Sequence, residues 1–100
     1  MTVKVITYKT KPESADENAR LIGAVYAELA KEQPEGLKYA TFRLDDGVSF
    51  VHVALLDGAV NPLSTSAAFA EFQAEIASRV ADGPVPSDAT VVGSYRLLPE

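Results

Sequence analysis

The order of two hydrophobic periodicities along the chain is the feature that most constrains its fold. Stretches in which apolar residues alternate or β-branched residues gather predict strands at 3–10, 37–44, 49–56 and 90–98. Apolar residues spaced three and four apart predict one helix after Ser14 and a second after the hydroxyl cluster 64–66. The predicted order is strand–helix–strand–strand–helix–strand, in a chain of 100 residues that has room for one core.

Local signals set the ends of several elements. Ser14, followed three positions later by Glu17, matches a capping box and predicts the start of the first helix, which Pro34 ends. The Asp-Asp-Gly sequence at 45–47 predicts the tight turn of a hairpin. The Asp-Gly-Pro-Val-Pro sequence at 82–86 predicts a loop before the last strand.

This order of elements is that of the α+β ferredoxin-like βαββαβ plait. Two helices cover one face of a four-stranded antiparallel sheet in this fold, and we expect one such domain over residues 1–100. We assign the following hairpin side chains to the covered face: Ala40, Phe42, Leu44, Val51, Val53 and Leu55. The opposite face then carries Tyr39, Phe50, Leu56, Val92 and Leu98.

The apolar side chains on that second face predict a homodimer. A monomer would expose them as one patch, which soluble monomers avoid. Two sheets that pair face to face, or close into a shared barrel, would bury the patch. We therefore expect two copies of the chain to associate through their sheets.

Four short segments resemble one family of proteins. They are Tyr8-Lys9-Thr10-Lys11-Pro12, Gly36-Leu37-Lys38-Tyr39, Phe50-Val51-His52-Val53 and Ala68-Phe69-Ala70-Glu71-Phe72. Together they resemble the dimeric α/β-barrel superfamily and, within it, the antibiotic-biosynthesis-monooxygenase-like domains, over nearly the whole chain. The resemblance implies a dimeric α/β barrel. It does not imply one reaction, because similar domains include cofactor-free monooxygenases, haem degraders, isomerases and members without known activity.

His52 is the single histidine of the chain. His52 and Arg43 are the candidate catalytic residues. On our assignment of faces, His52 points away from the helices into the space enclosed by a dimeric barrel. It would transfer a proton there while an arginine or tyrosine holds an oxyanion or phenolate. The candidate ligand-binding residues are Tyr39, Thr41, Phe50, Ser94 and Arg96. The competing interpretation is that His52, Arg43 and Arg96 only satisfy polar positions at the dimer interface.

Composition excludes several chemistries and partners. The chain has no cysteine and one histidine, so we expect no metal, and it has no glycine-rich phosphate loop, so we expect no cofactor. Haem degraders of the family use a helical histidine and a tryptophan, whereas this chain has no tryptophan and places His52 in a strand. A net charge of -5 with scattered lysine and arginine argues against nucleic acid and anionic membranes. The lack of an export signal favours the cytoplasm.

Two functions remain open. The first is a cofactor-independent, monooxygenase-like enzyme that acts on a small aromatic or polyketide-like molecule in the barrel cavity. The alternative is a non-catalytic homodimeric module that binds a small ligand or serves as an accessory protein. Both need the dimer, but only the enzyme needs His52 in an accessible cavity.

Overall fold

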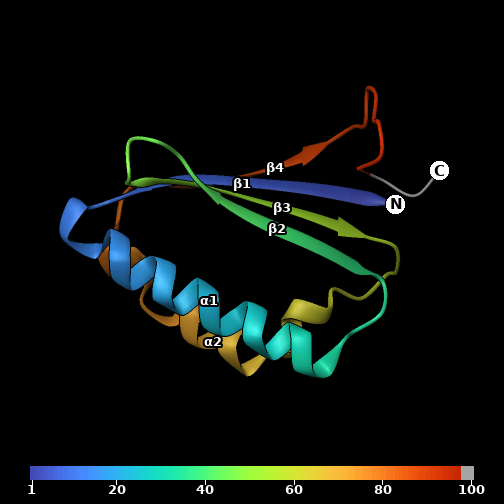
Figure 1. Ribbon diagram of the computed structural model, residues 1–100, viewed down its shortest axis with the longest axis horizontal. Helices are drawn as coiled ribbons and strands as arrows, with labels where there is room; N and C mark the ends of the chain where they lie inside the picture. Colours follow the sequence, from blue (N-terminus) through green and yellow to red (C-terminus); the bar gives the residue numbers. More distant parts are fainter. Residues whose placement is uncertain (98–100) are drawn as a thin grey trace.

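The computed structural model describes residues 1–97 and shows a sheet with one layer of helices against one face (Figure 1). The strands are β1 (Thr2–Thr10), β2 (Leu37–Arg43), β3 (Ser49–Leu56) and β4 (Val80–Ala89). The helices are α1 (Ala15–Glu32), α2 (Ala67–Ala74) and α3 (Ile76–Arg79), with short 3-10 turns η1 (Pro12–Ser14) and η2 (Pro62–Thr65). The predicted α+β ferredoxin-like plait is confirmed.

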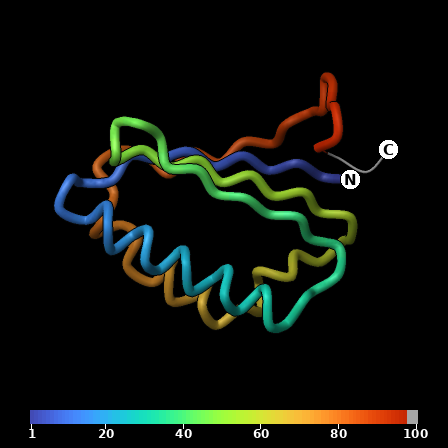
Figure 2. Tube along the Cα trace, viewed as in Figure 1, coloured from blue at the N-terminus to red at the C-terminus, as the bar shows by residue number. Residues whose placement is uncertain are grey.

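The four strands form one antiparallel sheet in the order β2-β3-β1-β4. His52 of β3 lies opposite Ile6 of β1 and Thr41 of β2. The Cα trace shows α1 and α2 side by side below the sheet (Figure 2). The helices therefore cover one face of the sheet, and β3 is one of its two central strands.

The helix ends follow the sequence signals only in part. Helix α1 begins at Ala15 as expected, but the Ser14 side chain makes no capping hydrogen bond, so the predicted capping box is wrong. The start of α2 is capped as the hydroxyl cluster predicts, because Ser66 Oγ accepts from the Phe69 N–H at 3.0 Å. Glu28 of α1 also accepts from the Ser66 hydroxyl, which ties the two helices together.

The assignment of the two sheet faces is inverted in the structure. Burial alternates along β3, and the buried set is Phe50, His52, Ala54 and Leu56. The helices therefore cover the face that carries His52, where Tyr8, Phe50 and Phe72 join the apolar core. Both faces of the hairpin carry apolar side chains, so alternation alone does not decide between them. The polar groups of the covered face can be buried because they hydrogen-bond to one another.

The last strand also lies earlier than predicted. Strand β4 spans Val80–Ala89 and includes the 82–86 segment that we expected to be a loop, whereas residues 90–97 form no strand. Its prolines are tolerated because β4 is an edge strand, which does not need every N–H for pairing. The end of the predicted strand at Leu98 lies outside the described residues.

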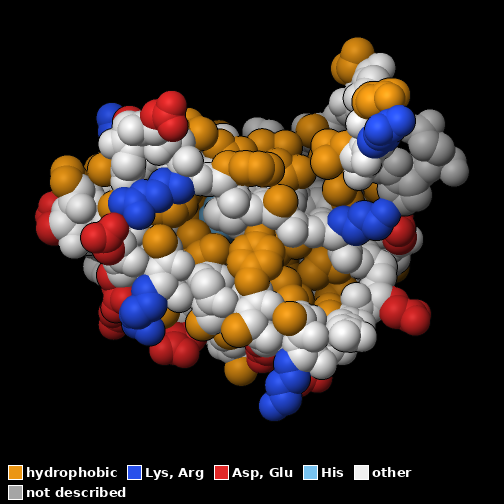
Figure 3. Space-filling view, viewed as in Figure 1, with side chains coloured by type: hydrophobic (Ala, Val, Ile, Leu, Met, Phe, Trp, Pro, Cys, Tyr) orange, Lys and Arg blue, Asp and Glu red, His pale blue; other side chains and the backbone are white. Residues whose placement is uncertain are grey.

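The outer face of the sheet is apolar and uncovered. Phe42, Leu44 and Val85 are exposed by 54%, 47% and 55%, and Val51 and Val53 beside them are half-buried. In the space-filling view this outer face lies along the upper edge of the molecule. Hydrophobic side chains gather there and also between the sheet and the helices (Figure 3). Within residues 1–97, no helix is both long and apolar enough to span a bilayer.

Candidate functional site

His52 lies at the centre of a buried hydrogen-bond network. His52 is only 4% exposed. The Tyr8 hydroxyl lies 2.8 Å from Nε2 of the imidazole, and the Tyr39 hydroxyl lies 2.5 Å from Nδ1. Thr41 Oγ1 lies 3.2 Å from the same Nδ1. Tyr8 and Tyr39 stand diagonally across from His52 on the two neighbouring strands, which is within reach of aromatic side chains.

The network continues into the helices on the Tyr8 side. Asn18 of α1 donates from Nδ2 to the Tyr8 hydroxyl at 2.9 Å, and Arg79 of α3 donates from Nε to Asn18 Oδ1 at 3.1 Å. A second Arg79 nitrogen donates to the Phe72 carbonyl at 2.5 Å. Asn18 is fully buried and Arg79 is 6% exposed. Among the described residues, every buried side-chain nitrogen and oxygen has a hydrogen-bond partner.

Burial favours the uncharged forms of His52, Tyr8 and Tyr39. It lowers the pKa of His52 from 6.5 to about 4, so the imidazole is neutral near pH 7. Burial raises the pKa of Tyr8 to about 12, against the opposing effects of the Asn18 hydrogen bond and the Arg79 charge. Burial also raises the pKa of Tyr39. The site therefore presents neutral hydroxyls rather than a charge.

A cavity of about 210 Å³ lies beside this network. Its walls come from the sheet, from α2 and α3, and from the proline-containing part of β4. Its lining residues are Ile6, Tyr8, Tyr39, His52, Phe69, Phe72, Gln73, Ile76, Pro84 and Pro86. None of these side chains is charged, and the polar groups of Tyr8, Tyr39 and His52 belong to one connected network. The cavity, here called the His52 cavity, suits an uncharged ligand that has an apolar body and a polar end.

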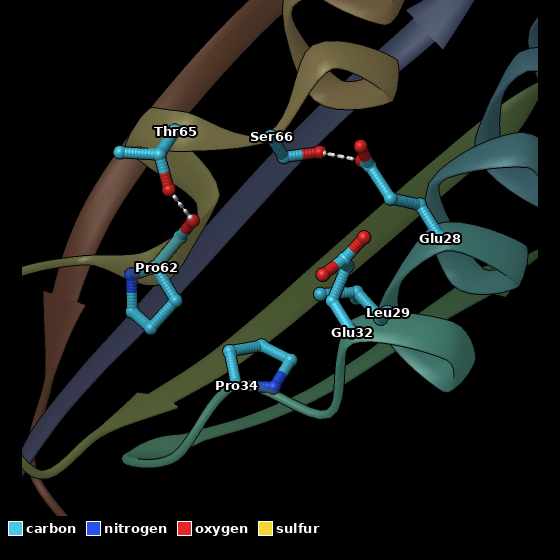
Figure 4. Close-up of a pocket in the computed structure, with 7 residues that line it drawn as sticks. All are labelled: Glu28, Leu29, Glu32, Pro34, Pro62, Thr65 and Ser66. Carbon is cyan, nitrogen blue, oxygen red and sulfur yellow. Dashed lines mark hydrogen bonds between the residues drawn. The ribbon is translucent and has the colours of Figure 1, made fainter.

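A larger hollow, shown in Figure 4, has fewer groups suited to catalysis. It has a volume of about 440 Å³ and lies between the end of α1 and η2. The carboxylate of Glu28 points at Ser66 there and is already used to cap α2, which lowers its pKa. Glu32 and Leu29 complete that side. Because Glu28 already caps α2 and Glu32 is exposed, we place the candidate site in the His52 cavity.

The structure brings together only some of the predicted site residues. Tyr39 and Thr41 contact His52 as expected, although on the helix-covered face. Phe50 is in the core, where its ring stacks on Tyr8 at 5.6 Å. Arg43 is exposed, and its side chain donates to the Gly47 carbonyl and to Asp16 rather than lining the cavity.

The two other predicted ligand-binding residues, Ser94 and Arg96, lie on the exposed segment that follows β4. Arg96 there packs over the ring of Tyr95 at 5.0 Å. Neither residue lines the His52 cavity in this chain. They were placed beside His52 because the last strand was predicted at 90–98, and the strand that pairs with β1 ends at Ala89.

Sequence reasoning missed Asn18 and Arg79. Asn18 does carry a signal, because it lies four residues before Ile22 and extends the apolar stripe of α1 by one polar position. A polar side chain on a buried stripe needs a buried partner. Arg79 has no such local signal, since its partner lies 61 residues away in the sequence.

Across residues 1–97, no group of three or more histidine, cysteine, aspartate or glutamate side chains could hold a metal ion. The one histidine already has both of its nitrogens in hydrogen bonds to protein hydroxyls.

The fold and the cavity define a small α+β plait with a neutral polar pocket between its sheet and its helices. No family model matches the sequence, and no curated protein matches it. Solved structures do match. One is described as an antibiotic biosynthesis monooxygenase: it has a TM-score of 0.75, is 18% identical, and the match covers 93% of this chain and 100% of that one.

Two further structures widen the comparison. A candidate antibiotic biosynthesis monooxygenase from Nitrosomonas europaea has a TM-score of 0.77 at 12% identity, over 93% of this chain and 100% of that one. An L-rhamnose mutarotase from Formosa agariphila has a TM-score of 0.59 at 12% identity, over 94% and 98%. These likenesses show that the chain has the fold of antibiotic biosynthesis monooxygenase-like proteins. The same fold also carries sugar chemistry, so the fold does not select the reaction.

Proposed function

We propose that the chain binds a small aromatic molecule in the His52 cavity and acts on it as a cofactor-independent, monooxygenase-like enzyme. The observation that carries the proposal is the cavity itself, in which aromatic and aliphatic walls surround 210 Å³ and Tyr8, Tyr39, His52 and Gln73 are the polar residues of the lining. The fold shared with structures described as antibiotic biosynthesis monooxygenases supports it.

The size of the cavity limits the ligand. An apolar protein cavity of roughly 150 Å³ holds benzene. A cavity of 210 Å³ therefore accommodates one substituted ring, and a polyketide of three or more fused rings would extend beyond it. Because no charged side chain lines the cavity, a neutral phenol fits better than a carboxylate or an amine.

Such a ring can react with O₂ without a cofactor, because the ring supplies the electrons. One atom of O₂ enters the ring, the other leaves as water, and the phenol becomes a quinone. Both hydrogens of that water come from the phenol, one from its hydroxyl and one from the ring carbon that is oxidised. The Tyr39 hydroxyl would pass a proton to the leaving oxygen, and His52 would return to Tyr39 a proton that the phenol releases. The apolar walls would exclude bulk water from the reacting ring.

Oxygen consumption with a panel of single-ring phenols tests this proposal. We expect consumption of O₂ and formation of quinone in equal amounts. Turnover should be lost in His52→Ala and in Tyr39→Phe and kept in Glu13→Gln, an exposed control. Arg43→Ala tests the predicted catalytic role of Arg43, which its place outside the cavity does not support. Full activity in a folded His52→Ala protein would remove His52 from the mechanism.

A non-catalytic binding module is the second candidate. It is favoured by the hydrogen bonds of His52, which occupy both ring nitrogens, and by a pKa of about 4, which makes the imidazole a weak base near pH 7. A phenol that binds in the cavity but is not oxidised in the presence of O₂ would select the module over the enzyme.

We further propose that two copies of the chain pair through the outer face of the sheet. The exposed Phe42, Leu44 and Val85 make that face an apolar patch that a second copy would bury. A solution mass near twice 10.7 kDa is expected, and Val53→Asp, at the middle of the face, should halve it. A wild-type mass near 10.7 kDa would contradict the dimer. The cytoplasmic location stays a prediction.

A further inference from the structure

The hydrogen bonds on the Tyr8 side of the network have fixed directions. A guanidinium can only donate, so Asn18 must turn its carbonyl oxygen toward Arg79. The amide nitrogen of Asn18 then faces Tyr8 and must donate to the hydroxyl oxygen at 2.9 Å. Arg79 is itself held by the Phe72 carbonyl and stacks over the Phe72 ring at 5.2 Å. The orientation of Asn18 therefore follows from the anchoring of Arg79.

The direction of these hydrogen bonds also determines which nitrogen of His52 carries the proton. The Tyr8 oxygen already accepts from Asn18, and the acceptor beside its own proton is Nε2 of His52 at 2.8 Å. If Nε2 carried the imidazole proton, both Asn18 and His52 would donate to the Tyr8 oxygen. The Tyr8 proton would then have no acceptor among the described residues of the network. A bare Nε2 satisfies every group, and it puts the proton of the neutral ring on Nδ1.

We propose that Asn18 and Arg79 are positioning residues that hold His52 in its Nδ1–H tautomer, so that the Tyr39 hydroxyl offers its own proton to a ligand. Nδ1–H donates to the Tyr39 oxygen at 2.5 Å, so the Tyr39 proton is not used on His52. Its acceptor within the network is Thr41 Oγ1, and a ligand oxygen in the cavity that Tyr39 lines would compete with Thr41 for this proton. The ligand class follows from this direction: an aromatic molecule whose oxygen accepts a hydrogen bond. The assignment of the ligand rests on the proposed function, whereas the tautomer does not.

An alternative role for Arg79 as a simple ion-pair partner has little support. Within residues 1–97, no carboxylate lies within salt-bridge distance of its guanidinium. The charge is instead buried against an amide oxygen and a backbone carbonyl. A buried arginine without a carboxylate is costly unless its donors are used, and here one donor sets the orientation of Asn18.

Asn18→Asp should reverse the chain of hydrogen bonds with almost no change of shape. A carboxylate at this position accepts from Arg79 and also from the Tyr8 hydroxyl. The Tyr8 oxygen then turns its lone pair toward His52 and accepts from Nε2–H. The variant should therefore carry the proton on Nε2. Asn61→Asp is the matched control, because Asn61 caps η2 far from the network and an aspartate accepts equally well there.

Nitrogen-15 NMR of the imidazole measures the tautomer directly. His52 is the single histidine of the chain, so one pair of ring nitrogens appears and needs no further assignment to a residue. We expect a protonated Nδ1 and a bare Nε2 in the wild type and in Asn61→Asp at neutral pH, and the opposite pattern in Asn18→Asp. A wild-type ring with the proton on Nε2 would overturn the proposal even if no variant folds. An unchanged pattern in folded Asn18→Asp would also overturn it.

A pair of probe ligands of equal shape tests the donor at the cavity. Acetophenone carries an acceptor oxygen, and isopropylbenzene replaces it with a methyl group. The ratio of their affinities should fall roughly tenfold from the wild type to Asn18→Asp, the effect of losing about one hydrogen bond. An unchanged ratio would refute the ligand part of the inference. If the tautomer reverses as expected but neither probe binds the wild type, the proposed function fails and the positioning role stands.

Discussion

Acid should destabilise the folded protein through His52. Burial lowers the pKa of this imidazole from 6.5 to about 4 in the folded state, so the unfolded chain takes up a proton in a pH range where the folded chain does not. The stabilisation by neutral His52 is therefore complete above pH 6.5 and is lost as the pH falls toward 4. The loss reaches roughly 3 kcal/mol at the acid end of this window.

Urea denaturation between about pH 7.5 and about pH 4.5, at one protein concentration, measures this loss. His52→Gln is the control, because an amide can hydrogen-bond but does not titrate. Below pH 6.5 the free energy of unfolding should fall by about 1.4 kcal/mol per pH unit more steeply in the wild type than in the variant. The lowered pKa of Asp46, about 2, places its own titration in both proteins below this window. Parallel profiles for the two proteins would refute the reasoning.

Four further predictions concern stability. Tyr8→Phe leaves two buried polar groups without a partner and should cost about 1–3 kcal/mol in urea denaturation; a cost near zero would mean that water replaces the hydroxyl. Glu28→Gln should lower the thermal midpoint by weakening the cap of α2, whereas Glu13→Gln should not; equal midpoints would remove Glu28 as a cap. Gly83→Ala should destabilise, because φ is +97° and the new Cβ would lie 3.0 Å from a backbone oxygen. Gly23→Ala, with open space around this position of α1, should stabilise the protein by about 0.5–1 kcal/mol. A Gly83→Ala protein that is more stable than Gly23→Ala would contradict both glycine predictions.

The element order was predictable because each element carries its own local signal. The 3.6-residue stripe of α1 and the alternation in β2 and β3 need no information from distant parts of the chain. Strand β4 was displaced in the prediction because Pro84 and Pro86 imitate a loop. Only the place of β4 at the sheet edge, which is a property of the whole fold, allows a strand with two prolines.

The site was predictable in part for a similar reason. Tyr39, Thr41 and His52 share one sheet face whichever face the helices cover, because the register of the hairpin fixes it. The choice of face was not predictable from alternation, since both faces are apolar. It depends on buried polar partners such as Asn18 and Arg79, which approach His52 from helices and are brought together only by the tertiary fold.

Ligand titration followed at the His52 ring tests the central claim most directly. The ring lines the cavity and belongs to the single histidine, so its carbon-bound protons report binding without overlap from other imidazoles. We predict a saturable shift of these signals with phenol, lost in Ile76→Trp, which fills the cavity, and kept in the exposed control Val60→Trp. No shift at His52, or the same shift in Ile76→Trp, would contradict a ligand site in this cavity.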